Sequence, residues 1–376
     1  MRIGIEAQRI FRTKKHGMDM VALESIRALQ RVDQQNEYVV FTNTGEDTAC
    51  LDPSGQVEVV SFGGPYPLWE QIKLPRKAKK HGLNLLHCTS NTAPVRCNMP
   101  LVVTVHDIIY FERHPLFASG YSAYQRFGNL YRRSVVKRII KSANLIITVS
   151  AYERENMISR FPFLENKLRV VYNGVGRHFK PVTDQDTLNK IRQKYQLPEH
   201  FVLFLGNTDP KKNSENSIVA FAMAMQEAEQ DYQLVVGDFD RSIVASYLEK
   251  AGLKDFMRRI HFPGYINNAD MPAIYSMADF YLYPSKRESF GIPILEAMAC
   301  GTPVITSKTA SMPEVGGDAA LFTDPFVIDD IAEKILLLAR NQQLRKELVA
   351  KGLERVKGFS WEASVQNLLK LYKSYA

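Results

Sequence analysis

The sequence predicts an α/β fold built from two doubly wound domains. Apolar, strand-like runs alternate with amphipathic helical stretches along the whole chain. Several of these runs are apolar on both faces, as in parallel sheets that helices cover on both sides. The rhythm restarts after the polar stretch 176–188, which contains Pro181 and no periodic apolar pattern. With 376 residues, the chain is long enough for two domains of about 150 residues or more each.

The expected elements follow one another in the same order in both halves. A final helix, 361–375, carries Trp361, Val365, Leu368, Leu369 and Tyr372 on one face, which must pack against another element. In the first half we expect helices at 20–31 and 128–142 and strands at 3–6, 38–42, 57–61, 83–87, 101–105, 145–149 and 168–172. In the second half we expect strands at 201–205, 233–236, 259–262, 280–283, 303–306 and 320–323.

Composition excludes several classes of protein. Hydrophobic residues make up 45% and charged residues 23% of the chain, which is typical of a globular protein and not of a disordered or fibrous one. No apolar run approaches the ~18 residues that span a bilayer. Glu6 follows Met1 too closely for a signal peptide, so we expect a cytoplasmic protein. The four cysteines form no CxxC pair, so neither a zinc site nor a disulfide framework is indicated.

Charge is distributed unevenly. Residues 1–180 hold 26 lysines and arginines against 15 acids, whereas residues 181–376 hold 22 against 25. The tracts 71–106 and 113–152 carry six and seven basic residues and no acid. This asymmetry indicates that the first half meets an anionic partner, with a solvated basic face as the alternative. A lipid surface and a phosphorylated substrate remain candidates, while the absence of helix-turn-helix, zinc-finger and RNP signatures argues against nucleic acid.

Three loops of the second half are expected at the carboxyl ends of strands, where open α/β sheets bind ligands. The first, 206–213, places Lys211 and Lys212 beside a coming helix, a combination that suits a phosphate or diphosphate. The second, 285–301, enters a helix through Gly291 and Pro293, and the free N–H groups near Gly291 offer another anion seat.

Two glutamates flank that second anion seat. A carboxylate beside a phosphate would repel it, so Glu288 and Glu296 are expected to bind hydroxyl groups, such as those of a ribose. The alternative for Glu296 is a glutamate that only stabilises the helix dipole. The third loop, 311–318, has a Pro–Glu turn and paired glycines and is expected to be a shaped loop near the same edge.

Together these loops resemble the second domain of a GT-B glycosyltransferase of the retaining, nucleotide-sugar-dependent family 4. The resemblance rests on Glu288-x7-Glu296 and on Pro210-Lys211-Lys212-Asn213, which is similar to the family's P-[RK]-K-N loop. It extends in order along nearly the whole chain. Further matches are Thr104-Val105-His106-Asp107, Thr148-Val149-Ser150, Tyr172-Asn173-Gly174-Val175, Met312-Pro313-Glu314-Val315 and Phe359-Ser360-Trp361.

The resemblance implies an architecture. Two Rossmann-like domains face one another across a cleft, and the last helix crosses back to the first. Residues 1–178 with helix 361–376 would form the acceptor-side domain, and residues 179–360 would form the domain that binds the nucleotide sugar.

The resemblance also implies roles for single residues. Lys211 and Lys212 would hold the donor's diphosphate, and Glu296 would bind the ribose hydroxyls. Glu288 would contact hydroxyls of the transferred sugar. The remaining donor-binding groups would be the backbone of Phe290, Gly291 and Ile292 at the start of the helix.

Two residues of the first domain would complete the site. His106 would line the cleft close to the reacting sugar, with a packed, polar-satisfied histidine as the alternative. Gly17 would belong to a glycine-rich loop that approaches the phosphate after the first strand. The chain departs from the family's G-G-I-G-R-Y-like pattern here, because it has His16-Gly17-Met18-Asp19-Met20, and among these residues only Gly17 matches well.

The implied reaction is transfer of a hexose from a UDP- or GDP-sugar to a hydroxyl of a glycan or lipid-linked acceptor, with retention of configuration. Lysines and helix amides would stabilise the departing nucleoside diphosphate, so neither a metal nor a cofactor is required. By analogy with the family, bacterial surface polysaccharide synthesis and mannose from a GDP donor are expected. The alternatives are a sugar-nucleotide epimerase or phosphorylase on the same fold and a two-domain sugar-binding protein.

Two further patterns in the sequence have competing interpretations. Asp238-Phe239-Asp240 has the DxD form of metal-dependent glycosyltransferases, but it lies in the second domain, and chance explains so short a pattern. In the helix at 128–142, basic residues surround Val135, Val136, Ile139 and Ile140; they are Arg132, Arg133, Lys137, Arg138 and Lys141. This helix either lies on an anionic membrane, as a peripheral protein would, or is a core helix with a cationic outer face.

Overall fold

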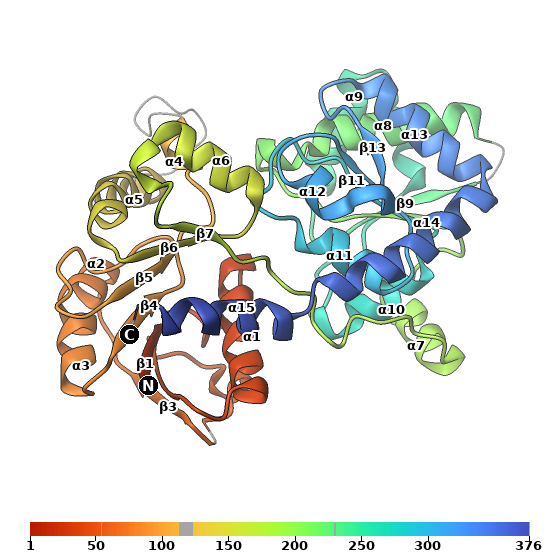
Figure 1. Ribbon diagram of the computed structural model, residues 1–376. Helices are drawn as coiled ribbons and strands as arrows, with labels where there is room; N and C mark the ends of the chain where they lie inside the picture. Colours follow the sequence, from red (N-terminus) through yellow and green to blue (C-terminus); the bar gives the residue numbers. More distant parts are fainter. Residues whose placement is uncertain (54, 113–122, 229–230, 376) are drawn as a thin grey trace. The chain divides into compact units, whose positions relative to one another are not determined.

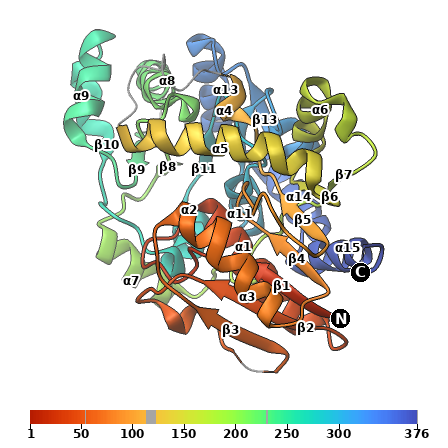
Figure 2. The same ribbon diagram turned by 90° about the vertical axis from the view of Figure 1, so that its left-hand side faces the viewer.

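The computed structural model describes residues 1–53, 55–112, 123–228 and 231–375. The chain forms two compact units (Figures 1 and 2). The first contains Met1–Gly174 and Trp361–Ala376, and the second contains Val175–Ser360. Val175 pairs with Ser360 through a parallel bridge, and its N–H donates to the carbonyl of Phe359 at 2.9 Å. The two points at which the chain leaves the second unit therefore lie side by side.

A parallel sheet of seven strands forms the centre of the first unit. Its order is β3-β2-β1-β4-β5-β6-β7. The strands are β1 (Arg2–Glu6), β2 (Glu37–Thr42), β3 (Val57–Ser61), β4 (Leu85–Cys88), β5 (Leu101–Thr104), β6 (Leu145–Thr148) and β7 (Leu168–Val170). Because β1 and β4 pair directly, the order of the strands reverses between them.

Helices cover both faces of this sheet, which is why its strands are apolar on both sides. One face packs its core against α3, α5 and α6, and the other against α1 and α15. The helices are α1 (Gly17–Val32), α2 (Tyr66–Leu68), α3 (Leu74–Lys80), α4 (Ile109–Glu112), α5 (Ala123–Ser142), α6 (Ala151–Arg160) and α15 (Trp361–Lys373), with a π-helical turn at Trp69–Lys73 between α2 and α3.

Helix α15 closes the first unit by packing on α1 (Figure 1). Its predicted apolar face is buried at Trp361, Val365, Leu368 and Tyr372. Arg31 of α1 binds Glu362 with Nη2–Oε1 at 2.7 Å. The apolar face of α15, which was predicted from the sequence, is therefore buried in the first unit.

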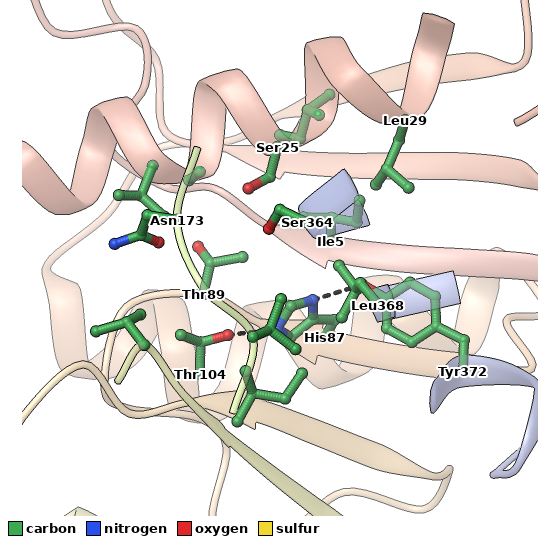
Figure 3. A pocket seen from close by; sticks show the side chains of 16 residues that line it. Ile5, Ser25, Leu29, His87, Thr89, Thr104, Asn173, Ser364, Leu368 and Tyr372 are labelled. Carbon is green, nitrogen blue, oxygen red and sulfur yellow. Dashed lines mark hydrogen bonds between the residues drawn. The ribbon is translucent and has the colours of Figure 1, made fainter. Parts of the chain in front are cut away.

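A small cavity lies beneath α1 and α15 (Figure 3). Its volume of about 40 Å³ is far below that of a site for a sugar nucleotide. The ring of His87 spans it, with Nδ1 2.6 Å from Tyr372 Oη and Nε2 2.8 Å from Thr104 Oγ1 (Figure 3). Burial lowers the pKa of His87 from 6.5 to about 3. His87 is thus a neutral linker between sheet and helix.

This linker makes the first unit sensitive to acid. Between pH 6.5 and about 3 the unfolded chain protonates His87 while the folded chain does not, so acidification lowers the free energy of unfolding by up to about 1.4 kcal/mol per pH unit. We expect His87→Gln to flatten this dependence between pH 7 and pH 5. Trp69 and Trp361 are the chain's two tryptophans and both lie in this unit, so urea titrations followed by tryptophan fluorescence report it selectively. An unchanged dependence in the variant would contradict the assignment.

The second unit is built on a six-stranded parallel sheet of order β10-β9-β8-β11-β12-β13. The strands are β8 (Phe201–Phe204), β9 (Gln233–Val236), β10 (Ile260–His261), β11 (Phe280–Tyr283), β12 (Val304–Ser307) and β13 (Leu321–Thr323). The helices are α7 (Gln185–Tyr195), α8 (Ser214–Glu227), α9 (Arg241–Lys250), α10 (Met271–Met277), α11 (Ile292–Ala299), α12 (Met312–Gly316), α13 (Ile328–Arg340) and α14 (Gln342–Arg355). Helices α8, α9 and α13 form the core on one face.

The doubly wound α/β prediction is confirmed, and each of the thirteen strands in the described part of the chain overlaps an expected run. One expectation is wrong in detail. The stretch 311–318 is not a shaped loop, because Met312–Gly316 forms helix α12. Pro313 fits the first turn of a helix, where its missing N–H costs nothing, so Pro–Glu there begins a helix instead of a turn.

Candidate active site

The strand order of the second unit singles out one edge of its sheet. From β8 the chain proceeds to β9 and β10 on one side, and then to β11, β12 and β13 on the other. The carboxyl ends of β8 and β11 therefore flank a topological switch point, where open α/β sheets form a ligand crevice. The loops 205–213 and 284–291 leave these two strand ends, and they contain most of the predicted donor-binding residues.

The loop after β8 is held in a fixed shape. A Cβ on Gly206 would lie 2.4 Å from the ring of Phe204, so a larger residue would force this buried ring to move. Asp209 caps a 3₁₀ turn over Pro210–Lys212 by accepting the N–H of Lys211 at 3.1 Å. Asn213 adopts a left-handed backbone, and its Nδ2 donates to the carbonyl of Pro284 at 3.0 Å. These contacts tie the loop to the end of β11.

Lys212 and Glu288 meet at this edge. Lys212 Nζ lies 2.7 Å from Glu288 Oε1 and 3.0 Å from Tyr283 Oη. The Lys212 side chain is 20% exposed and that of Glu288 is 13% exposed, so the pair is shielded but reachable. Ion pairs of this kind keep much of their strength because water screens them less than surface pairs.

Lys211 follows a different course from Lys212. Its Nζ lies 3.9 Å from Asp209 Oδ2, and its side chain is 37% exposed. Its carbonyl accepts the N–H of Lys286 at 2.7 Å, which joins the two loops again. The two predicted diphosphate ligands are thus neighbours in sequence, but only Lys212 is engaged with Glu288.

The loop after β11 leads into helix α11 through Gly291. Gly291 has φ of 104°, a conformation that other residues avoid. Ser311 Oγ lies 2.9 Å from the carbonyl of Glu288 and 2.8 Å from that of Phe290, and it holds the loop by donating to one or the other. Helix α11 begins at Ile292, so the first N–H groups of the helix directly follow the loop that contains Glu288. Ser311 was not among the site residues predicted from the sequence.

Glu296 lies one turn inside α11. Its Oε2 is 3.5 Å from the hydroxyl of Tyr275, a long and weak contact. Although part of the residue reaches solvent, burial raises the pKa of Glu296 to about 7. The carboxylate of Glu296 therefore has only one weak hydrogen bond to offset the cost of its burial, and it can accept a hydrogen bond from a hydroxyl group.

The two site residues predicted in the first unit have different surroundings. Gly17 is the first residue of α1, and a Cβ there would meet nothing within 4 Å. Its neighbour Asp19 is buried in an ion pair with Arg9, Nε–Oδ1 2.7 Å, and also accepts the N–H of His16. Asp19 therefore stabilises the fold at this point.

His106 follows β5 and is buried. The ring nitrogen Nε2 of His106 lies 2.9 Å from the carbonyl oxygen of Thr89. The backbone N–H of His106 donates to Asn91 Oδ1 at 2.6 Å. Burial lowers the pKa of His106 below its usual value. Since a carbonyl only accepts, Nε2 carries the hydrogen and Nδ1 of the neutral ring is an acceptor. His106 is thus a polar-satisfied histidine that retains one acceptor.

The first unit has a polar cluster at its own switch point, between β1 and β4, which was not predicted from the sequence. Glu6 ends β1, is almost fully buried and accepts the N–H of Gln8 at 2.9 Å. Burial raises the pKa of Glu6 to about 7. The nearby carboxylate of Glu70 accepts hydrogen bonds from Tyr66 at 2.9 Å and Tyr131 at 2.5 Å. The sequence does contain one signal for this cluster, because Glu6 is a charged residue at the end of a strand whose preceding residues 3–5 are apolar.

The DxD pattern, Asp238-Phe239-Asp240, directly precedes α9 and has a structural role there. Asp240 Oδ1 accepts the N–H of Ser242 at 2.7 Å and so caps α9. Asp238 lies in the turn before it with φ of 47°. Among the described residues, no group of three or more histidine, cysteine, aspartate or glutamate side chains is placed to hold a metal ion.

Helix α5 has a core face and a cationic outer face. Val135, Val136, Ile139 and Ile140 are buried against the sheet. Lys137, Arg138 and Lys141 are exposed, and so are Phe127 and Leu130, at 62% and 47%. Residues 113–122 of the basic tract lie outside the described part. Among the residues that the structure describes, no helix combines the length and apolar character needed to cross a membrane.

Known glycosyltransferases resemble this chain in both of its halves. The family model "Glycosyltransferase Family 4" matches residues 16–178, and "Glycosyl transferases group 1" matches residues 187–355. The chain is 31% identical over 279 residues to O-antigen chain mannosyltransferase B of Escherichia coli, a match that covers 72% of this chain and 70% of the relative. It is 27% identical over 273 residues to the Escherichia coli serotype-specific mannosyltransferase WbdA, which covers 69% of this chain but only 32% of that longer relative.

Solved structures share the fold. HepE from Anabaena, in complex with UDP and glucose, superposes with a TM-score of 0.76 at 20% identity over the whole of both chains. Sucrose-phosphate synthase from Thermosynechococcus elongatus superposes with a TM-score of 0.74 at 22% identity, covering 99% of this chain and 98% of that one. The two family models match both halves of the chain, a mannosyltransferase is among its relatives, and each unit contains a parallel sheet. The chain therefore belongs to the family 4 glycosyltransferases of the GT-B fold.

Proposed function

We propose that this glycosyltransferase moves a hexose from a UDP- or GDP-sugar to a hydroxyl of a glycan or lipid-linked acceptor, with retention of configuration and without a metal ion or cofactor. The observation that carries the proposal is the shielded Lys212–Glu288 pair at the switch point, beside the start of α11. A cation for a diphosphate and a carboxylate for hydroxyls lie within 2.7 Å of one another. A nucleotide sugar presents both kinds of group in one molecule.

Each residue of this edge has a proposed task. Lys212, with Lys211, binds the diphosphate and stabilises the charge that grows on it as the sugar departs. The backbone at Phe290, Gly291 and Ile292 adds N–H groups from the start of α11. Glu288 binds hydroxyls of the transferred hexose, and Glu296 binds the ribose.

The first unit supplies the acceptor side in this proposal. Gly17 leaves room for the donor at the start of α1, and His106 accepts a hydrogen bond through Nδ1 from a hydroxyl of the reacting sugar. Mannose is the favoured hexose, because the relative covered over 70% of its length is named as an O-antigen chain mannosyltransferase. A role in bacterial surface polysaccharide synthesis follows from the same similarity.

A donor panel tests the proposal. The protein is incubated with UDP-glucose, UDP-galactose, UDP-N-acetylglucosamine and GDP-mannose, with and without a mannose-terminated acceptor and with and without EDTA. Acceptor-dependent, EDTA-resistant release of nucleoside diphosphate from one donor is the expected result. Interconversion of the sugar nucleotide without an acceptor would indicate an epimerase, dependence on free phosphate would indicate a phosphorylase, and binding without turnover would indicate a sugar-binding protein. Each of these three results would overturn the proposal.

We further propose that α5 brings the enzyme to an anionic membrane surface, where lipid-linked acceptors lie. Its outer face combines exposed Phe127 and Leu130 with Lys137, Arg138 and Lys141. We expect co-sedimentation with vesicles that contain phosphatidylglycerol, and loss of binding between about 50 mM and 500 mM salt. Replacing Lys137 and Lys141 by glutamine weakens binding, whereas the same change at exposed Lys250 and Lys346 of the second unit does not. Equal binding to neutral vesicles, or binding indifferent to salt, would contradict this prediction.

A further inference from the structure

Tyr283 is a third member of the Lys212–Glu288 pair. It is the last residue of β11, and the residue is only 2% exposed. Its hydroxyl accepts a hydrogen bond from Lys212 Nζ at 3.0 Å, while the same nitrogen lies 5.1 Å from the centre of its ring. The carboxylate of Glu288 lies near this hydroxyl, and burial together with that negative charge holds the pKa of Tyr283 well above its usual range. The three groups thus form a triangle in which Lys212 bonds to the other two and Glu288 lies close to the phenol.

Of the three, Tyr283 has the most rigid support. Its carbonyl accepts a hydrogen bond from Thr306 Oγ1 of β12 at 3.0 Å. Its ring stacks on that of Tyr281, two residues earlier on the same face of β11, with centroids 5.5 Å apart and planes inclined by 23°. Lys212 and Glu288, by contrast, come from the loops that follow β8 and β11. The strand therefore fixes the phenol, and the phenol fixes the two loop side chains.

The triangle also determines what remains available for a ligand. An ammonium group has three N–H donors. Two of those of Lys212 are directed to Tyr283 and Glu288, which leaves one for an oxygen of the donor. The orientation of that last N–H is set by the first two contacts. Removing the phenolic oxygen would leave Lys212 with one contact and free rotation about its stem.

We propose that Tyr283 is a positioning residue of the transfer reaction, which aims Lys212 at the departing diphosphate and holds Glu288 toward the sugar without touching the donor itself. This inference rests on the proposed function. Preorganised groups stabilise the transition state because they need no reorientation as charge develops. A loss of orientation should therefore appear in turnover more than in the affinity for the nucleoside diphosphate.

The test compares Tyr283→Phe with Tyr281→Phe. Both changes remove one phenolic oxygen from a buried ring of the same stack. Among the described residues, however, the hydroxyl of Tyr281 makes no hydrogen bond to Lys212 or Glu288. We expect Tyr283→Phe to lower kcat, and kcat/KM with it, by about tenfold or more. The dissociation constants for UDP and GDP should stay within about threefold of wild type, and the two variants should have similar melting temperatures. Tyr281→Phe should keep kcat close to wild type.

Several results would overturn the inference. Equal kcat in the two variants would show that the hydroxyl of Tyr283 has no special role. A parallel loss of nucleotide binding and of melting temperature in Tyr283→Phe alone would show a structural role. Failure of the proposed function is distinguishable, because the wild-type enzyme would then turn over none of the donors, and this inference would fall with it.

Discussion

Lys212→Ala is expected to lower kcat/KM for the sugar nucleotide by about 10³-fold. The change removes the cation that neutralises the departing diphosphate, and it leaves Glu288 as an unpaired carboxylate at the place where the diphosphate binds. The second effect adds repulsion to the loss of attraction, so the affinity for the free nucleoside diphosphate should fall as well. The measurement is release of nucleoside diphosphate from the donor selected by the panel, with calorimetric titration of UDP and GDP.

A matched control comes from the next strand of the same sheet. Lys308 directly follows β12 and pairs with Asp324 at 3.1 Å, but its side chain is 60% exposed. Lys308→Ala therefore removes a lysine–carboxylate pair of similar geometry outside the switch point, and the proposed function assigns it no effect on turnover. Equal losses in the two variants, or full activity of Lys212→Ala, would show that the pair at the switch point is not the donor site.

Glu296→Gln is expected to act in opposite directions on stability and on donor binding. The pKa of Glu296 is raised from 4.5 to about 7 in the folded chain, mainly by burial. The folded state thus loses stability as pH rises from 4.5 through 7, because the ionised carboxylate is disfavoured there relative to the unfolded chain. A neutral amide avoids this cost, so the variant should be about 1–3 kcal/mol more stable than wild type at pH 8 and nearly equal to it at pH 4.5.

The same variant should bind the donor less well. An amide oxygen accepts hydroxyl hydrogen bonds less strongly than a carboxylate, so we expect about a tenfold rise in the dissociation constant of the nucleoside diphosphate. Urea unfolding at the two pH values and calorimetry measure the two effects. Glu333→Gln, at an exposed position of α13, is the control and should change neither. Lower stability at pH 8 with unchanged affinity would contradict both parts of the expectation.

Elements whose pattern is local could be predicted from the sequence. The strands are short, apolar on both faces and bounded by polar turns, so their positions were recognisable without tertiary information. The loops that hold Lys212 and Glu288 were also recognisable, because both follow buried strands. Their meeting at one edge follows from the switch between β8 and β11, a feature of strand order that residue types do not encode.

Features that depend on packing could not be predicted in the same way. Tyr283 reads as one more apolar strand residue, and only the pairing of β11 with β8 brings its hydroxyl to Lys212. Glu6 and Glu70 are far apart in sequence, and the approach of their carboxylates depends on the turn at Trp69–Lys73. For α5, the sequence left a membrane face and a core face indistinguishable, and burial of Val136 and Ile139 against the sheet decides the apolar side.

Hydrogen–deuterium exchange with and without UDP or GDP tests the central claim most directly. The account predicts that nucleoside diphosphate slows exchange in the segments 206–213 and 286–296, because it occupies the switch point and the first N–H groups of α11. The segment after β12, including Lys308, should change little. Protection in both predicted segments would place the donor site at the Lys212–Glu288 pair. Protection confined to other parts of the chain, at nucleotide concentrations that saturate binding, would contradict that assignment.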